Sequence, residues 1–134
     1  MRVRAFVVVM AAVALTACGG GGSESPTPAA RPSSTAQISI TSPADGSTVQ
    51  GPTVSVSFDL TGAEISQETS TNLVPDKGHV HVFLDDMLVG MNYQLDGTVP
   101  DVAPGTHVLR VEFVALDHGP FDPPVFAQAA FQVT

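Results

Sequence analysis

Polar and apolar residues alternate along most of the chain beyond residue 52. Residues 53–60, 79–84 and 106–116 each place apolar side chains at every second position, and residues 125–133 are expected to form a last strand. Successive side chains of a β-strand point to opposite faces, so a period of two is typical of half-buried antiparallel strands. No window shows a convincing helical period. The pattern therefore predicts an all-β domain.

Clusters of Gly, Pro and Asp separate these runs, at residues 43–46, 96–97, 99–101 and 104–105. Such clusters are typical of turns. Short strands separated by turns at this density predict a single antiparallel immunoglobulin-like (Ig-like) β-sandwich. Residues 40–62 also resemble the first hairpin of many bacterial Ig-like modules. The sequence shows no internal repeat and no second domain.

The first 17 residues have the character of an export signal. Arg2 and Arg4 precede an uncharged run rich in Ala and Val, and Leu15-Thr16-Ala17-Cys18 supplies small residues at a cleavage point. These four residues resemble the bacterial lipobox, in which the cysteine becomes the lipidated first residue of the mature protein. We therefore expect residues 1–17 to be a lipoprotein signal peptide and Cys18, the only cysteine, to carry a lipid anchor. Plain secretion with cleavage after Ala17 is the alternative.

The expected anchor places the protein outside the cytoplasm, attached to the cell membrane or the outer membrane of a bacterial envelope. Gly19 follows the cysteine in place of the Asp that retains lipoproteins at the inner membrane, which favours the outer membrane in a Gram-negative host. Residues 18–36, rich in Gly, Ser and Pro, are expected to form a flexible tether. The folded Ig-like domain is then expected over residues 37–134.

Acidic residues dominate the charge of the chain. The net charge is −8, and removal of residues 1–17 leaves three basic residues against 13 acidic ones. This balance argues against nucleic acid as a partner and is compatible with a bound cation. Besides the membrane, the expected partners are a metal ion or another envelope protein.

Two of the four histidines, His79 and His81, lie two residues apart in one expected strand. Side chains at positions i and i+2 share one face of a strand. In an Ig-like sandwich this strand pairs antiparallel with the run of residues 106–116. Its start then lies beside the end of that run. We therefore expect His118, which follows the run, at the same rim of the sandwich as the first two histidines.

This rim is a candidate metal site. Cu²⁺ and Zn²⁺ accept neutral imidazole, so His79, His81 and His118 are candidate ligands of either ion. Asp117 and Asp122 are expected nearby, as a further ligand or as acceptors that orient an imidazole. In the alternative interpretation no metal binds, and the histidines hydrogen-bond to neighbouring Asp side chains and loop carbonyls. The sequence leaves both interpretations open.

A tight hairpin is expected directly after the histidine strand, with Asp85-Asp86 as a two-residue turn. Such a turn prefers Gly at its second position, so a slightly longer loop is the alternative. If Leu84 pairs with Met87, His81 lies opposite Gly90. The glycine would then leave space for a ligand beside the histidine, or ease the twist of the strand.

We expect no enzymatic activity. The only cysteine lies at the lipidation site, and no Ser or Thr lies in a nucleophile-elbow pattern. The His-x-His strand resembles that of the copper–zinc superoxide dismutases, which are also Ig-like sandwiches, and a copper-only version would need His107 at the site. His107 begins the run of residues 106–116, so we expect it at the opposite end of the sandwich, bonded to a turn.

Three segments together resemble an uncharacterised family of bacterial Ig-like lipoprotein domains with Gly-His-x-His and Asp-His-x-Pro motifs. They are "GHVHVFLDDMLVGM", "PGTHVLRVEF" and "LDHGPFDPPV". The matching positions are His79, His81, His107, Asp117, His118, Pro123 and Pro124. The resemblance covers about residues 37–134 and implies the Ig-like fold. It implies no activity, because the family has no assigned function.

Overall fold

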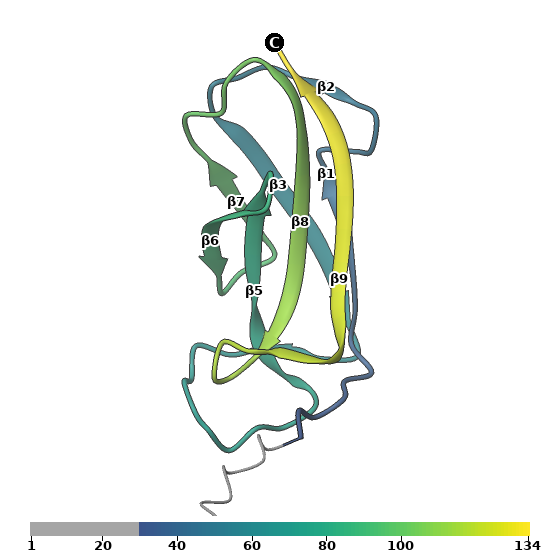
Figure 1. Ribbon diagram of the computed structural model, residues 1–134, viewed down its shortest axis with the longest axis vertical. Helices are drawn as coiled ribbons and strands as arrows, with labels where there is room; N and C mark the ends of the chain where they lie inside the picture. Colours follow the sequence, from purple (N-terminus) through teal and green to yellow (C-terminus); the bar gives the residue numbers. More distant parts are fainter. Residues whose placement is uncertain (1–29) are drawn as a thin grey trace, which may run out of the picture.

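The computed structural model describes residues 30–134, which form two β-sheets packed face to face (Figure 1). One sheet has the strand order β1-β3-β7, and the other has the order β2-β9-β8-β5-β4, with β6 also paired to β5. The strands are β1 (Gln37–Ser42), β2 (Thr48–Val49), β3 (Val54–Thr61), β4 (Glu64–Ile65), β5 (Lys77–Leu84), β6 (Met87–Asn92), β7 (Asp96–Val99), β8 (Gly105–Ala115) and β9 (Pro120–Val133). The predicted Ig-like β-sandwich is confirmed. The expected signal peptide, Cys18 and the tether up to residue 29 lie outside the described residues.

Alternate residues of the strands form the core between the two sheets. Val56 and Phe58 of β3 face Val82 of β5 and Val111 and Phe113 of β8, and all five side chains are almost completely buried. The polar residues between them point away from the core, as the period of two predicts. Burial of these apolar faces supplies the main driving force for packing the sheets together.

The strand that carries two histidines pairs antiparallel with β8, as predicted. Leu84 of β5 lies opposite Leu109, and His79 lies opposite Val114. The start of β5 therefore adjoins the end of β8, at the end of the sandwich that is lowest in Figure 1. The loops that enter β5 and leave β8 meet at this end, and the described chain also begins there.

The β5–β6 hairpin has the expected two-residue turn but not the expected register. Asp85 and Asp86 have φ angles of 49° and 66°, and Leu84 pairs with Met87. Positive φ at both central residues is characteristic of the type I′ turn, which matches the twist of the flanking strands. A bulge beyond the turn then shifts the pairing, because β6 contains one extra residue there. His81 consequently lies opposite Met91, and the predicted pairing with Gly90 is wrong.

The last strand begins at Pro120, five residues before the predicted start. Val114 pairs with Pro120 whereas Phe113 pairs with Val125, so residues 121–124 are accommodated in an irregularity of the ladder. Asp122, expected in a loop, therefore lies within the bounds of β9. The sequence misled here because proline lacks the N–H needed for regular pairing, and Pro123-Pro124 resembles a loop.

Residues 31–36, which the sequence assigned to the tether, lie against the sandwich. Ala36 is buried in the core, and the Pro32 carbonyl oxygen accepts a hydrogen bond from the Asp122 N–H at 2.9 Å. The first strand nevertheless begins at Gln37, so these residues contact the sandwich from outside its strands. Among the described residues, no helix has the length and apolar character needed to span a membrane.

Candidate metal centre

Three histidine rings meet where β5 begins and β8 ends. His79 Nε2 lies 3.1 Å from His81 Nε2 and 2.9 Å from His118 Nδ1. One nitrogen of each ring lies within 4.8 Å of a nitrogen of both others. Within residues 30–134, no other group of three or more His, Cys, Asp or Glu side chains converges in this way. The structure thus brings together the three histidines that the sequence placed at one rim.

The alternation of β5 determines where two of these rings lie. Val80 and Val82 point into the core, so His79 and His81 lie on the outer face of the six-stranded sheet. This part of the outer face is covered, because only 1% of His79 and 7% of His81 is exposed. The Tyr93 ring lies against His79, with 5.1 Å between ring centroids.

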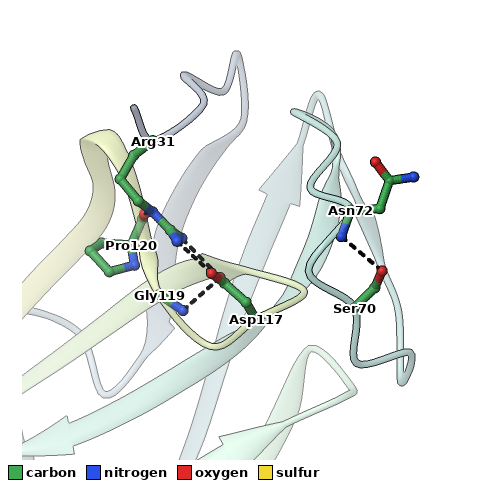
Figure 2. A network of polar contacts seen from close by, with 6 residues as sticks. All are labelled: Arg31, Ser70, Asn72, Asp117, Gly119 and Pro120. Atoms are coloured by element: carbon green, nitrogen blue, oxygen red, sulfur yellow. Dashed lines mark hydrogen bonds and ion pairs between the residues drawn. The ribbon is translucent and has the colours of Figure 1, made fainter. Parts of the chain in front are cut away.

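The loop between β4 and β5 closes over the same end of the sheet. The Ser66 N–H donates to the Gly78 carbonyl oxygen at 2.7 Å, and the Ser70 N–H donates to the Leu116 carbonyl oxygen at 3.2 Å. Ser70 Oγ in turn accepts a hydrogen bond from the Asn72 N–H (Figure 2). The loop is therefore bonded both to the start of β5 and to the residue that follows β8.

Gly78 brings β5 unusually close to β8 directly before His79. It pairs with Ala115, and a Cβ atom at position 78 would lie 1.8 Å from the Val114 carbonyl oxygen. No Cβ atom fits there unless one strand moves. The glycine of the Gly-His-x-His motif therefore determines how closely the backbone that carries His79 lies to β8.

His118 comes from the tight turn between β8 and β9. Its φ is 66°, in the left-handed region that His adopts more readily than most other non-glycine residues. The His118 N–H donates to the Ala115 carbonyl oxygen, and the Ala115 N–H donates to the Gly119 carbonyl oxygen, each at 2.9 Å. This turn directs the third ring back over β5, where its centroid lies 4.4 Å from that of His79.

Arg31 fixes the same turn from the N-terminal side (Figure 2). Its Nη1 and Nη2 atoms donate to the two carboxylate oxygens of Asp117 at 2.5 and 2.9 Å, and its Nε donates to the Pro120 carbonyl oxygen at 2.7 Å. Asp117 Oδ1 also accepts the Gly119 N–H. The hydrogen bond from Arg31 is the main reason why the pKa of Asp117 is lowered to about 2. The residues on both sides of His118 are thus held by charge-assisted hydrogen bonds.

The site favours neutral imidazole. The pKa of His79 is lowered to about 4, mainly by burial and also by the neighbouring rings of His118 and His81. Burial, followed by the proximity of His118, also lowers the pKa of His81. Both effects disfavour the charged form, because the charge would be poorly solvated and would face a second positive ring. At neutral pH, His79 and His81 therefore present lone pairs.

The rings have few partners apart from one another. The hydrogen-bond contacts of His79, His81 and His118 within the described residues join imidazole to imidazole. His79 Nδ1 is buried and has no hydrogen-bond partner among residues 30–134. A neutral imidazole has one N–H and one lone pair, so one polar atom of His79 is unsatisfied in either tautomer. An unsatisfied buried group costs about 1–3 kcal/mol, so the cluster is a poor device for stabilising the fold.

The acidic residues considered with the histidines do not join them. The Asp117 carboxylate is occupied by Arg31 and the Gly119 N–H. Asp122 is exposed on β9. Neither belongs to the converging group, so within the described chain the donor set consists of imidazole nitrogens.

His107 lies at the opposite end of β8, as predicted. Its Nδ1 contacts Asp85 Oδ2 at 2.6 Å and its Nε2 contacts the Ala103 carbonyl oxygen at 2.7 Å. These acceptors raise the pKa of His107, with the Asp85 hydrogen bond as the largest cause. His107 is therefore a bonded histidine near a turn and is separate from the three converging rings.

Sequence reasoning missed several residues around the site. Tyr93 and Met91 were not predicted as neighbours of the site, because the predicted register of β6 was wrong by one residue. Arg31 was not predicted there because it was assigned to the tether. Glu112 lies directly opposite His81 and is 6% exposed. Its carboxylate pairs with Arg110. The alternation of β8 with β5 places Glu112 and His81 on one face, so the pattern contained this signal.

Comparison with known proteins supports the fold alone. No protein-family model matches the chain, and no curated protein matches it. Among solved structures, the chain is similar to the fibronectin(III)-like modules of Clostridium thermocellum CbhA, with 16% identity and a TM-score of 0.52. The match covers 73% of this chain and 46% of the other, so this chain spans less than half of that relative's length. An engineered protein matches at 15% identity and a TM-score of 0.47, over 74% of this chain and 20% of the other.

Proposed function

We propose that this protein is an envelope lipoprotein whose Ig-like domain binds a transition-metal ion, Cu or Zn, through His79, His81 and His118. The observation that carries this proposal is the convergence of one nitrogen from each ring at one point. Two of these rings come from a strand and the third comes from a loop, and all three belong to one end of the sandwich.

The separations of the nitrogens suit a shared ion. Donors bound at about 2.0–2.1 Å in tetrahedral geometry lie about 3.3 Å apart. The measured separations of His79 Nε2 from His81 Nε2 and from His118 Nδ1 are 3.1 and 2.9 Å. The converging nitrogens of all three rings lie within 4.8 Å of one another, so rotations of the side chains would bring them to a common spacing. A water molecule or another protein group would complete four-coordination.

The protonation state supports the same conclusion. A metal ion must compete with protons for imidazole lone pairs, and lowered pKa values at His79 and His81 weaken that competition at neutral pH. The metal-free interpretation expected Asp side chains and loop carbonyls as partners of the histidines. The contacts between the rings give that interpretation no support.

Metal binding rather than catalysis is the function that we propose. A copper-only dismutase-like site would need a fourth histidine at the cluster. His107 lies near the β5–β6 turn, at the far end of β8, where it bonds to Asp85. The solved relatives match the fold only and provide no reaction to transfer.

The cellular location is proposed from sequence alone. The lipobox-like segment before Cys18 supports a lipid anchor at the cell membrane or the outer membrane. Metabolic labelling with a radioactive or clickable fatty acid would test the anchor. Label should appear in the wild-type protein and disappear in a Cys18→Ala variant. Equal labelling of both proteins would contradict lipidation at Cys18.

Calorimetric titration tests metal binding. The full chain, kept in detergent micelles, would be titrated separately with Cu²⁺ and Zn²⁺. We expect saturable 1:1 binding that is lost in a His79→Ala/His81→Ala double variant. A His107→Gln variant is the matched control, because it removes a histidine remote from the site and should retain the affinity. Equal affinity in the wild type and the double variant would refute the proposal.

A metal-free interaction module of the cell envelope is the second candidate. It is favoured by exposed apolar side chains on β6, where Met87 is 72% exposed and Leu88 is 45% exposed. Surface patches of this kind often mark contacts with other proteins. A pull-down from envelope extract in the presence and absence of a chelator would separate the two candidates. Capture of one specific protein, unaffected by chelator and lost on substitution of Leu88 by Ser, would favour the interaction module.

A further inference from the structure

The β6 strand places a thioether beside the histidine cluster. The observed register sets Met91 directly opposite His81. Residues opposite each other in an antiparallel pair project from the same face, with Cβ atoms about 4.5–5.5 Å apart. Met91 therefore lies on the same outer face as His79 and His81. The bulge between Val82 and Phe83 produces this register, because without it Gly90 would occupy the position.

Met91 borders a solvent-open hollow beside the residue that packs on His79. Met91 and Tyr93 line a surface hollow of about 300 Å³. The Tyr93 ring lies against His79. Met91 is 48% exposed, whereas His79 and His81 are almost completely buried. The thioether is thus a soft ligand atom at the accessible margin of a donor set in which His79 and His81 are buried and His118 is partly buried.

The charge of the site also discriminates between ions. Each member of the converging group is an imidazole, and the buried carboxylate nearest to His81 along the sheet, that of Glu112, is paired with Arg110. Neutral donors in a buried site do not cancel the charge of a divalent ion, and residual charge is costly in a low-dielectric environment. A monovalent ion carries less of this cost. Soft thioether ligands select Cu(I) in particular.

We propose that the ion is Cu(I) and that Met91 is a further ligand to it beside His79, His81 and His118. This inference rests on the proposed metal function and names the ion that the site prefers. Met91 is flexible and lies at the margin, so its sulfur reaches the ion by rotation of the side chain. The Met91 sulfur would strengthen the binding of Cu(I) more than the binding of Zn²⁺, because Zn²⁺ gains little from a thioether ligand.

The test compares two methionines of the same strand. Met91→Leu removes the sulfur opposite His81 with little change in volume. Met87→Leu is the matched control, since Met87 pairs with Leu84 at the turn and is 72% exposed. The full chain in detergent would be measured anaerobically with Cu(I), kept reduced by ascorbate, against a chromogenic Cu(I) chelator. Zn²⁺ affinity would be measured in parallel.

We expect Met91→Leu to weaken Cu(I) binding by roughly tenfold or more, as ligand-sphere changes commonly do. Zn²⁺ binding of that variant and both affinities of Met87→Leu should stay unchanged. The X-ray absorption spectrum of the Cu(I)-loaded wild type should contain a sulfur scatterer that is lost only in Met91→Leu.

The outcomes separate this inference from the proposed function. Tight Cu(I) binding without a sulfur scatterer, or equal Cu(I) affinities in both variants, would overturn the role of Met91 while leaving the histidine site intact. Stronger binding of Zn²⁺ than of Cu(I) would overturn the preference for copper in the same way. Failure of the wild type to bind either ion would refute the proposed function itself, and this inference with it.

Discussion

Arg31 binds both carboxylate oxygens of Asp117, the residue that directly precedes the loop histidine of the cluster, at 2.5 and 2.9 Å. The two residues are 86 positions apart in the chain. Arg31 also donates to the Pro120 carbonyl oxygen, so it holds the turn on both sides of His118. The segment just before the first strand therefore helps to position the third imidazole of the candidate site.

Replacement of Arg31 by Gln should weaken metal binding more than it weakens the fold. The variant loses the bidentate contact with Asp117, so the turn that carries His118 gains freedom. Loss of such a supporting contact commonly costs about 10–100-fold in metal affinity. The ion pair is partly exposed, so the cost in unfolding free energy should be below about 1 kcal/mol. Calorimetric titration and urea denaturation of the same samples measure both effects.

Lys77→Gln is the control for this substitution. Lys77 lies at the start of β5 and pairs with Glu64 at 3.9 Å, in a largely exposed contact. It removes one positive charge near the same end of the domain, as Arg31→Gln does. Its metal affinity should equal that of the wild type. An equal loss of affinity in both variants would indicate a general effect of charge and contradict a positioning role for Arg31.

The metal-free protein should lose stability as the pH falls from about 6.5 to about 4. The pKa of His79 is about 4 in the folded protein, below its ordinary value of 6.5. The unfolded chain therefore takes up the proton first, and acid favours unfolding across this window. The loss should be on the order of 3 kcal/mol, because each unit of pKa difference corresponds to about 1.4 kcal/mol.

The substitution His79→Leu tests this prediction. Leucine has a similar volume, removes the titrating group and removes the unpartnered Nδ1. The variant should keep or increase its unfolding free energy at pH 5 and lose metal binding. Urea denaturation in the presence of a chelator, at several pH values, provides the measurement. A variant with the same acid-dependent loss as the wild type would show that another group is responsible.

The sequence was sufficient for the sandwich and for the meeting of the three histidines, for a simple physical reason. The alternation of apolar residues determines which face of β5 carries His79 and His81, and the pairing of β5 with β8 is a general property of the fold. Once that pairing is assumed, His118 must follow β8 at the same end. These inferences need only strand order and the period of two.

Details that depend on irregular backbone could not be obtained in the same way. The bulge in β6 shifts the register so that Met91, and not Gly90, lies opposite His81. A bulge of this kind leaves no clear signal in an alternating sequence pattern. The ion pair of Arg31 with Asp117 joins a Pro- and Ser-rich segment to a distant turn. From its composition alone, that segment was expected to be a tether. Both features depend on long-range geometry rather than on local preference.

The pair formed by His107 and Asp85 should make stability depend on pH in the opposite sense. Both nitrogens of His107 contact acceptors, so the doubly protonated ring is favoured and its pKa is raised. Its contribution to stability is complete below the unfolded value of about 6.5 and is lost as the pH rises through the higher folded pKa. In His107→Gln the urea midpoint should change less between pH 6 and pH 9 than in the wild type. An identical change in both proteins would contradict this assignment.

The substitution Gly78→Ala should damage the fold and the site together. A Cβ atom at position 78 would lie 1.8 Å from the Val114 carbonyl oxygen, so β5 must move away from β8 exactly where His79 is attached. Overpacking of this kind costs about 1–3 kcal/mol, and a clash with backbone belongs at the upper end.

Gly90→Ala is the matched control in the neighbouring strand, because its nearest contact is the Asn92 side-chain oxygen at 3.2 Å, which can rotate away. Thermal unfolding with and without added metal should show a large loss for Gly78→Ala, with weaker stabilisation by the ion, and a small loss with normal stabilisation for Gly90→Ala. If Gly78→Ala bound metal as tightly as the wild type, the close approach of β5 and β8 would be irrelevant to the position of His79.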